Sequence, residues 1–141
     1  MNGRVGLVVL LVSGVVLTAV GALGLVAPDV LHQANGLPTV DHPGLLSEAR
    51  GAGATLLAVG IAALAGARVR AWRPAMTALS ALVLLAYAAG RAVSWAADGA
   101  PGQGLATAGL VELLLGTAAA GLVLNDRFGA GATDRVSSPP R

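Results

Sequence analysis

Four long apolar segments, free or almost free of charge, constrain this chain more than any other feature of its sequence. An α-helix rises about 1.5 Å per residue, so about 20 apolar residues cross a hydrocarbon layer about 30 Å thick. The segments run over Val5–Ala27, Ser47–Ala67, Ala75–Ala97 and Leu105–Leu124. Only 11% of the 141 residues are charged, against about 25% in soluble domains, so lipid is the solvent that suits the chain. We therefore predict an all-α fold, an integral membrane antiparallel bundle of four transmembrane helices.

The four segments cover more than half of the chain and predict one membrane domain over residues 1–124. Residues 125–141 are rich in Gly, Ser and Pro and poor in apolar side chains, which predicts a disordered cytoplasmic tail. A cleaved secretory signal peptide is the alternative to the first span. Signal peptides have apolar regions of only about 7–15 residues, and Pro28 follows the best small-residue site at Ala27, so we favour the span.

The positions of arginine predict the orientation, because short loops rich in Lys or Arg stay in the cytoplasm. The chain has no Lys, and seven of its arginines flank the spans on one predicted side: Arg4, Arg68, Arg70, Arg73, Arg127, Arg135 and Arg141. The loops 28–46 and 98–104 carry no Arg. The absence of Lys beside abundant Ala, Gly and Arg is typical of a GC-rich bacterial genome. We expect a multi-pass protein of the bacterial plasma (inner) membrane with both termini cytoplasmic.

The sequence lacks the residues that several classes of function require. The chain has no Cys, which excludes disulfides and thiolate chemistry. Its arginines form no basic stripe and only 3% of its residues are aromatic, so we expect no nucleic-acid partner. The first outer loop contains oxygen and nitrogen atoms that could ligate a metal ion, on Asp29, His32, Asp41 and His42. Polar residues in a solvated loop explain these four equally well. We predict no metal and no cofactor.

Glycines spaced by seven residues recur in three of the spans. The pairs are Gly14 and Gly21, Gly53 and Gly60, and Gly109 and Gly116. At this spacing both members of a pair share one helix face, where the missing side chain lets two backbones approach closely. We predict that these faces pack helices together, either within one chain or between copies in a homo-oligomer.

Five polar residues form a candidate site in the outer half of the predicted bundle. Arg91 lies seven residues before Asp98, which directly follows its span, and Glu112 lies seven residues after Leu105, the start of the next span. Both therefore lie about 10 Å below the outer surface, with opposite charges. Glu48 and Arg50 enter from the same side, and Ser94 follows Arg91 by about one turn. Charge in hydrocarbon is costly and is usually paired inside the protein, so we predict a connected polar cluster.

This cluster has two interpretations. A neutral set of charges fixes the order of helices without any ligand. The same set also suits a polar or anionic head group. The guanidinium of Arg50 or Arg91 would bind the head group through two parallel hydrogen bonds, and Glu48 or Glu112 would accept a proton. Tyr87, one turn before Arg91, is more often a packed ring than a ligand contact.

Two functional hypotheses follow from these interpretations. The first is an uncharacterised binding or accessory membrane protein, which holds a lipid, quinone or other amphiphile head group or docks on a partner membrane protein. The alternative is a membrane enzyme or proton-coupled carrier that uses a buried carboxylate. The chain shows neither a nucleophile motif nor an internal repeat, which favours the first hypothesis.

The assembled motifs resemble a known family. They are S-E-x-R-G-x-G from Ser47, G-R-x-x-S from Gly90, D-G-x-P from Asp98, and Glu112. In order and spacing they resemble the bacterial domain of unknown function 4345 family over nearly the whole chain. The resemblance implies a small four-helix inner-membrane protein without an established activity, with Glu48, Arg50, Arg91 and Glu112 as its characteristic polar positions. After Gly51 this family commonly shows an aromatic residue and two glycines, whereas this chain has Ala52, Gly53 and Ala54, so a ring at the site is missing.

Overall fold

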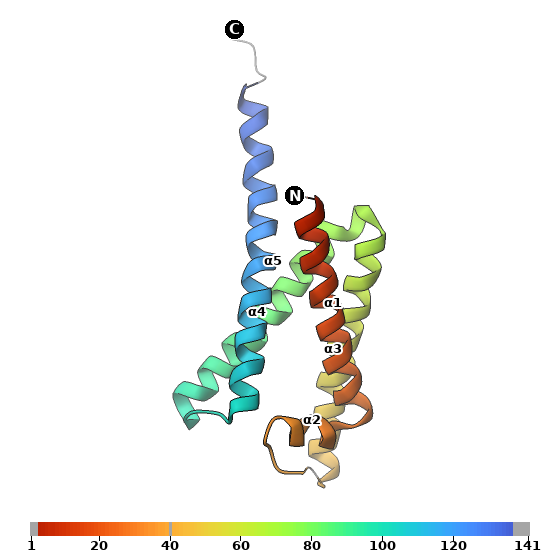
Figure 1. The fold of residues 1–141 in the computed structure, drawn as a ribbon, viewed down its shortest axis with the longest axis vertical. Helices are drawn as coiled ribbons and strands as arrows, with labels where there is room; N and C mark the ends of the chain where they lie inside the picture. Colours follow the sequence, from red (N-terminus) through yellow and green to blue (C-terminus); the bar gives the residue numbers. More distant parts are fainter. Residues whose placement is uncertain (1–2, 40, 137–141) are drawn as a thin grey trace.

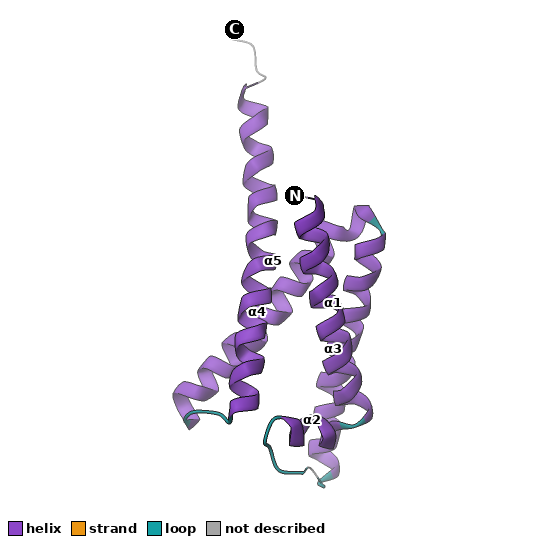
Figure 2. Ribbon diagram, in the orientation of Figure 1, coloured by secondary structure: helices purple, strands orange, loops and turns teal. Residues whose placement is uncertain are grey.

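The computed structural model describes residues 3–39 and 41–136, and over these residues the chain forms helices, turns and loops without a strand (Figures 1 and 2). The helices are α1 (Gly3–Val26), the short α2 (Pro28–Ala34), α3 (Pro43–Arg68), the 3-10 turn η1 (Arg70–Trp72), α4 (Arg73–Asp98) and α5 (Gln103–Val136). Four of these helical segments are long and apolar enough to cross a membrane, and they match the four predicted spans. The all-α prediction is confirmed.

The four long helices form two antiparallel pairs, α1 with α3 and α4 with α5 (Figure 1). The start of α1, the end of α5 and the α3–α4 connection lie at one end of the molecule, while α2 and the α4–α5 turn lie at the other. We call the latter the α2 end. Toward it, α4 leans away from α3 together with α5, so the two pairs diverge there. This divergence positions the candidate site.

The second span begins earlier than the sequence analysis predicted, at Pro43 rather than at Ser47. The His42 imidazole caps the helix, because its Nδ1 accepts a hydrogen bond of 3.2 Å from the Gly44 amide. Pro43 takes the first helical position, where its missing N–H costs nothing. At the other end of α3, Arg73 donates from Nε and Nη2 to the Ala67 carbonyl, at 3.2 and 2.9 Å, and so fastens the connection to α4.

Helix α5 continues beyond Leu124, the predicted end of the fourth span, and into the segment predicted to be a disordered tail. Residues 125–136 contain no proline, the residue most disruptive to a helical backbone. The helix extends to Val136, and the predicted tail residues 137–141 lie outside the described residues.

Glycines set the distance between paired helices, as the spacing by seven predicts. A Cβ atom on Gly53 would lie 2.5 Å from the backbone of Gly24 and Leu25, and one on Gly21 would overlap the backbone of Leu57. On α5, a Cβ on Gly116 would lie 2.8 Å from Leu85 of α4. These faces pack helices within one chain.

The interior is small and the outside is apolar. The buried side chains include Leu10, Leu17, Leu56 and Leu84, together with the hydroxyls of Ser13, Thr77 and Ser80. Many large apolar side chains instead face outward, including Val8, Leu82, Val93 and Leu114. Such a surface suits a lipid environment, where packing of small residues rather than burial from water joins the helices.

Candidate functional site

The centre of the site is an ion pair between α4 and α5. The Arg91 Nε donates to Glu112 Oε2 at 2.8 Å, and Arg91 Nη2 donates to Glu112 Oε1 at 3.0 Å. The side chains are 30% and 15% exposed, respectively. Two parallel bonds of this kind fix the plane of the guanidinium and are stronger than a single contact. The pairing expected from equal depth and opposite charge is present.

The local sequence explains why these two side chains meet. Gly99 ends α4 with a φ of 100°, a conformation that favours glycine, and lets the chain turn back into α5. Gly109 lies one turn before Glu112 on α5, and a Cβ atom there would be 3.2 Å from Arg91 Cδ. The absent side chain of Gly109 therefore leaves room for the stem of Arg91.

A cavity of about 160 Å³ lies beside the pair, where the two helix pairs diverge. Residues from all five α-helices line it. Its apolar walls come from α1, α2 and α3, among them Val20, Leu31 and Leu56. Its polar lining consists of His32, Tyr87, Arg91 and Glu112. The cavity thus brings four polar side chains from three helices to the border of one partly open space.

His32 is the member of this set that the sequence analysis placed in a solvated loop. It lies instead on α2, which packs under the ends of α1 and α3. Its Nδ1 is buried and has no hydrogen-bond partner among the described residues. A buried polar atom without a partner is unusual and calls for an explanation. Pro28 at the first position of α2 and Asp29 in its first turn are the sequence signals for this helix.

Tyr87 is the second residue that the sequence analysis left out of the site. It lies one turn before Arg91 on α4, so the two side chains share a face. Its ring packs against the core around Leu17, Leu56 and Leu84, as expected for a packed aromatic residue. It also lines the cavity, and so has both roles.

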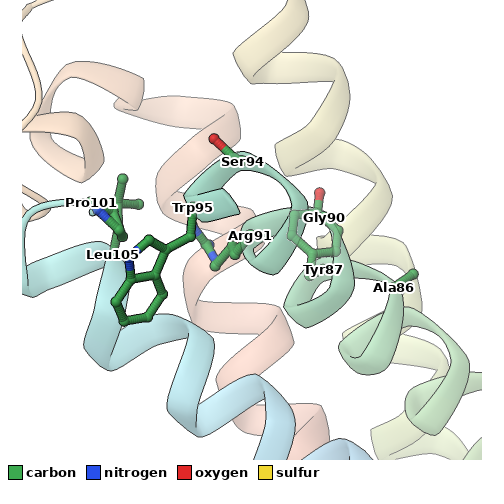
Figure 3. Close-up of a pocket in the computed structure, with 8 residues that line it drawn as sticks. All are labelled: Ala86, Tyr87, Gly90, Arg91, Ser94, Trp95, Pro101 and Leu105. Carbon is green, nitrogen blue, oxygen red and sulfur yellow. The ribbon is translucent and has the colours of Figure 1, made fainter. Parts of the chain in front are cut away.

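Two open grooves, lined by residues of α4, α5 and the turn between them, adjoin Arg91. One, of about 470 Å³, is lined by Tyr87, Arg91 and Trp95, and Figure 3 shows Trp95 directed toward Pro101 and Leu105. The other, of about 550 Å³, is bordered almost entirely by apolar side chains of α4 and α5, such as Leu85 and Leu113. Arg91 lines both grooves and the cavity.

The other predicted members of the cluster lie apart from the pair. Ser94 is exposed and donates to Asp98 Oδ2 at 3.0 Å, with its hydroxyl turned away from Arg91 (Figure 3). Glu48 and Arg50 are exposed on α3 and do not line the cavity. Ala49 between them does line the cavity. Neighbouring residues on a helix are rotated by about 100° from each other, so Glu48 and Arg50 lie on helix faces other than the one that borders the cavity. Direct contacts therefore unite only Arg91 and Glu112 of the five predicted residues.

The residues considered for a metal site also separate. His42 caps α3, whereas His32 faces the cavity. Among the side chains that the structure describes, in residues 3–39 and 41–126, no three from His, Asp or Glu are grouped closely enough to hold a metal ion.

Comparison with known proteins gives one match. The family model described as Domain of unknown function (DUF4345) matches residues 6–123, from the first turn of α1 to the part of α5 beyond Glu112. No curated protein and no solved structure matches the chain.

Proposed function

The chain belongs to the DUF4345 family, whose name assigns no activity, and we propose that it binds the polar head group of an amphiphile beside Arg91 and Glu112. The proposal places the protein among binding or accessory membrane proteins. It uses the cavity at the α2 end for the head group and the groove lined by α4 and α5 for the apolar tail.

One observation carries the proposal: Arg91 borders both a cavity with four polar side chains in its lining and a groove that is lined almost entirely by apolar ones. The cavity holds four polar side chains, whereas the groove of about 550 Å³ is bordered by Leu85, Leu110 and Leu113 among other apolar residues. Arg91 borders both. An amphiphile has the same division into a polar and an apolar part, and the groove is lined by residues of two helices long enough to cross a membrane, α4 and α5.

The purely structural interpretation accounts for less of the site. An ion pair that only joins α4 to α5 explains the bond between Arg91 and Glu112. It does not explain why the pair borders a cavity, or why His32 Nδ1 is buried there without a partner. A ligand with its own hydrogen-bonding atoms supplies what His32 lacks.

The distribution of arginine supports a defined orientation in the membrane. Arg68, Arg70 and Arg73 lie at the α3–α4 connection, at the same end as the start of α1 with Arg4. The loops of the α2 end carry no Arg. By the preference of basic loops for the cytoplasm, the α2 end faces the outside of a bacterial inner membrane, and the ligand enters from the outer leaflet.

The test is native mass spectrometry of the full chain purified in a mild detergent. Wild type is compared with Arg91→Ala and with a matched control, Arg50→Ala, which removes an equal charge from an exposed position outside the cavity. We expect a discrete bound mass on wild type and on Arg50→Ala, and its loss from Arg91→Ala at unchanged helix content by circular dichroism.

Two outcomes would contradict the proposal. Wild type without any bound mass, even after incubation with a total lipid extract, would leave the cavity without a ligand. If Arg91→Ala and wild type retained the bound mass equally, the molecule would be bound somewhere other than beside Arg91.

A further inference from the structure

We infer that the head group in this cavity is uncharged, about the size of one six-membered ring, and bears both a hydrogen-bond donor and an acceptor, as phenols and quinols do. The inference rests on the proposed function and narrows it to a class of ligand. It follows from the charge, the hydrogen-bonding atoms and the volume of the cavity.

The charge of the cavity argues against an anionic head group. Glu112 compensates the charge of Arg91 through two hydrogen bonds, so the charged groups of the lining sum to zero. A phosphate that approached Arg91 would also come close to the Glu112 carboxylate, because both side chains line the same cavity. The two like charges would repel each other more strongly in this partly buried site than in bulk water, whereas an uncharged group meets no such opposition.

The hydrogen-bonding atoms favour a ligand that both donates and accepts. The ion pair engages Nε and Nη2 of Arg91, which leaves its Nη1 amino group to donate to a ligand oxygen. The Glu112 carboxylate retains lone pairs and can accept. His32 Nδ1 accepts or donates according to the tautomer of the ring. A hydroxyl or carbonyl oxygen on the ligand satisfies these groups without adding charge.

The volume limits the head group to a small one. A cavity of about 150 Å³ in another protein holds one benzene molecule, and this cavity has about 160 Å³. One oxygenated ring fits, whereas a phosphate with its glycerol backbone is larger. The Tyr87 ring and the Leu56 side chain supply apolar contact to the faces of such a ring.

The test uses three probes that share a decyl chain and differ in the head: decyl 4-hydroxybenzoate, decyl phosphate and decylbenzene. Each is titrated into the full wild-type chain in the same detergent, and bound probe is counted by native mass spectrometry. We expect one decyl 4-hydroxybenzoate per chain, with an affinity at least about tenfold higher than that of either other probe, a difference of about 1.4 kcal/mol.

A variant provides a second and independent measurement. Glu112→Gln removes the compensating charge and leaves Arg91 positive, so decyl phosphate becomes the preferred probe. Glu48→Gln makes the same chemical change at an exposed position outside the cavity and leaves the wild-type preference unchanged. Circular dichroism of each variant checks that it is folded. If Glu112→Gln does not fold, the comparison of the three probes on wild type still tests the inference.

The outcomes separate the inference from the proposed function. Tighter binding of decyl phosphate than of decyl 4-hydroxybenzoate to wild type, lost in Arg91→Ala, would overturn the uncharged class and keep the site. Equal binding of all three probes, unaffected by Arg91→Ala, would overturn both. An unchanged preference in folded Glu112→Gln would overturn the charge argument.

Discussion

Arg91 and Glu112 are separated by 21 residues in the sequence and lie on different helices, yet their side chains meet in two parallel hydrogen bonds of 2.8 and 3.0 Å. The pair joins α4 to α5, and both side chains line the cavity that α1, α2 and α3 also border. The pair therefore contributes to the stability of the fold as well as to the lining of the cavity.

Removing one partner of the pair should destabilise the fold. Breaking a buried ion pair leaves an uncompensated charge at a cost of about 3–5 kcal/mol, and the partial exposure of this pair reduces that cost to about 1–3 kcal/mol. We expect Arg91→Met and Glu112→Leu each to lower the thermal midpoint in detergent. The double variant, which has neither charge, should recover most of the loss and still fail to bind ligand. A double variant no more stable than either single variant would contradict this account, because it would mean that the loss does not come from an uncompensated charge.

Gly109→Val should weaken ligand retention. A side chain at this position meets Arg91 Cδ, which lies 3.2 Å from the site of a Cβ atom, and the guanidinium must shift. Gly121→Val is the matched control on the same helix, because a Cβ there meets nothing within 4 Å. We expect a loss of affinity of about tenfold for Gly109→Val, or about 1.4 kcal/mol, and little change for Gly121→Val. Equal affinities of the two variants would mean that Arg91 need not be held in this position.

Gly53→Ala should separate α1 from α3. Its Cβ atom would lie 2.5 Å from the backbone of Gly24 and Leu25, where no side chain can give way. Overpacking of this kind costs about 1–3 kcal/mol. Gly51→Ala, two residues earlier, meets nothing within 4 Å and should be neutral or stabilising by up to about 1 kcal/mol. Thermal unfolding followed by circular dichroism compares the two, and a Gly53→Ala protein as stable as Gly51→Ala would refute the close packing.

Single-cysteine labelling tests the proposed orientation, since the natural chain has no Cys. Thr39→Cys lies in the exposed loop between α2 and α3, and Ala71→Cys lies in the exposed α3–α4 connection. In intact cells a membrane-impermeant maleimide should label Thr39→Cys, and it should label Ala71→Cys only after the membrane is opened. The reverse pattern would place the α2 end in the cytoplasm.

The parts of the structure that the sequence predicted are those that depend on helix length and depth alone. The four long helices follow from apolar runs, and the meeting of Arg91 with Glu112 follows from counting residues to the ends of two adjacent spans. The glycine faces follow from the period of the helix.

The parts that the sequence did not predict depend on how whole helices rotate and pack. Glu48 and Arg50 were assigned to the cluster by depth, but the close α1–α3 contact turns Ala49 between them toward the cavity. His32 lies on a helix of seven residues, too short to produce an apolar period. Its burial under α1 and α3 arises only from the tertiary arrangement.

Photochemical crosslinking with peptide mapping tests the central claim most directly, because it locates the bound head group. The probe is decyl 4-hydroxybenzoate with a diazirine on its ring. We predict crosslinks to residues that line the cavity, such as Leu31 and Leu56, which disappear with excess unmodified compound and in Arg91→Ala. Crosslinks spread over outward-facing residues such as Leu82 and Val93, unaffected by competitor, would contradict a head-group site beside Arg91 and Glu112.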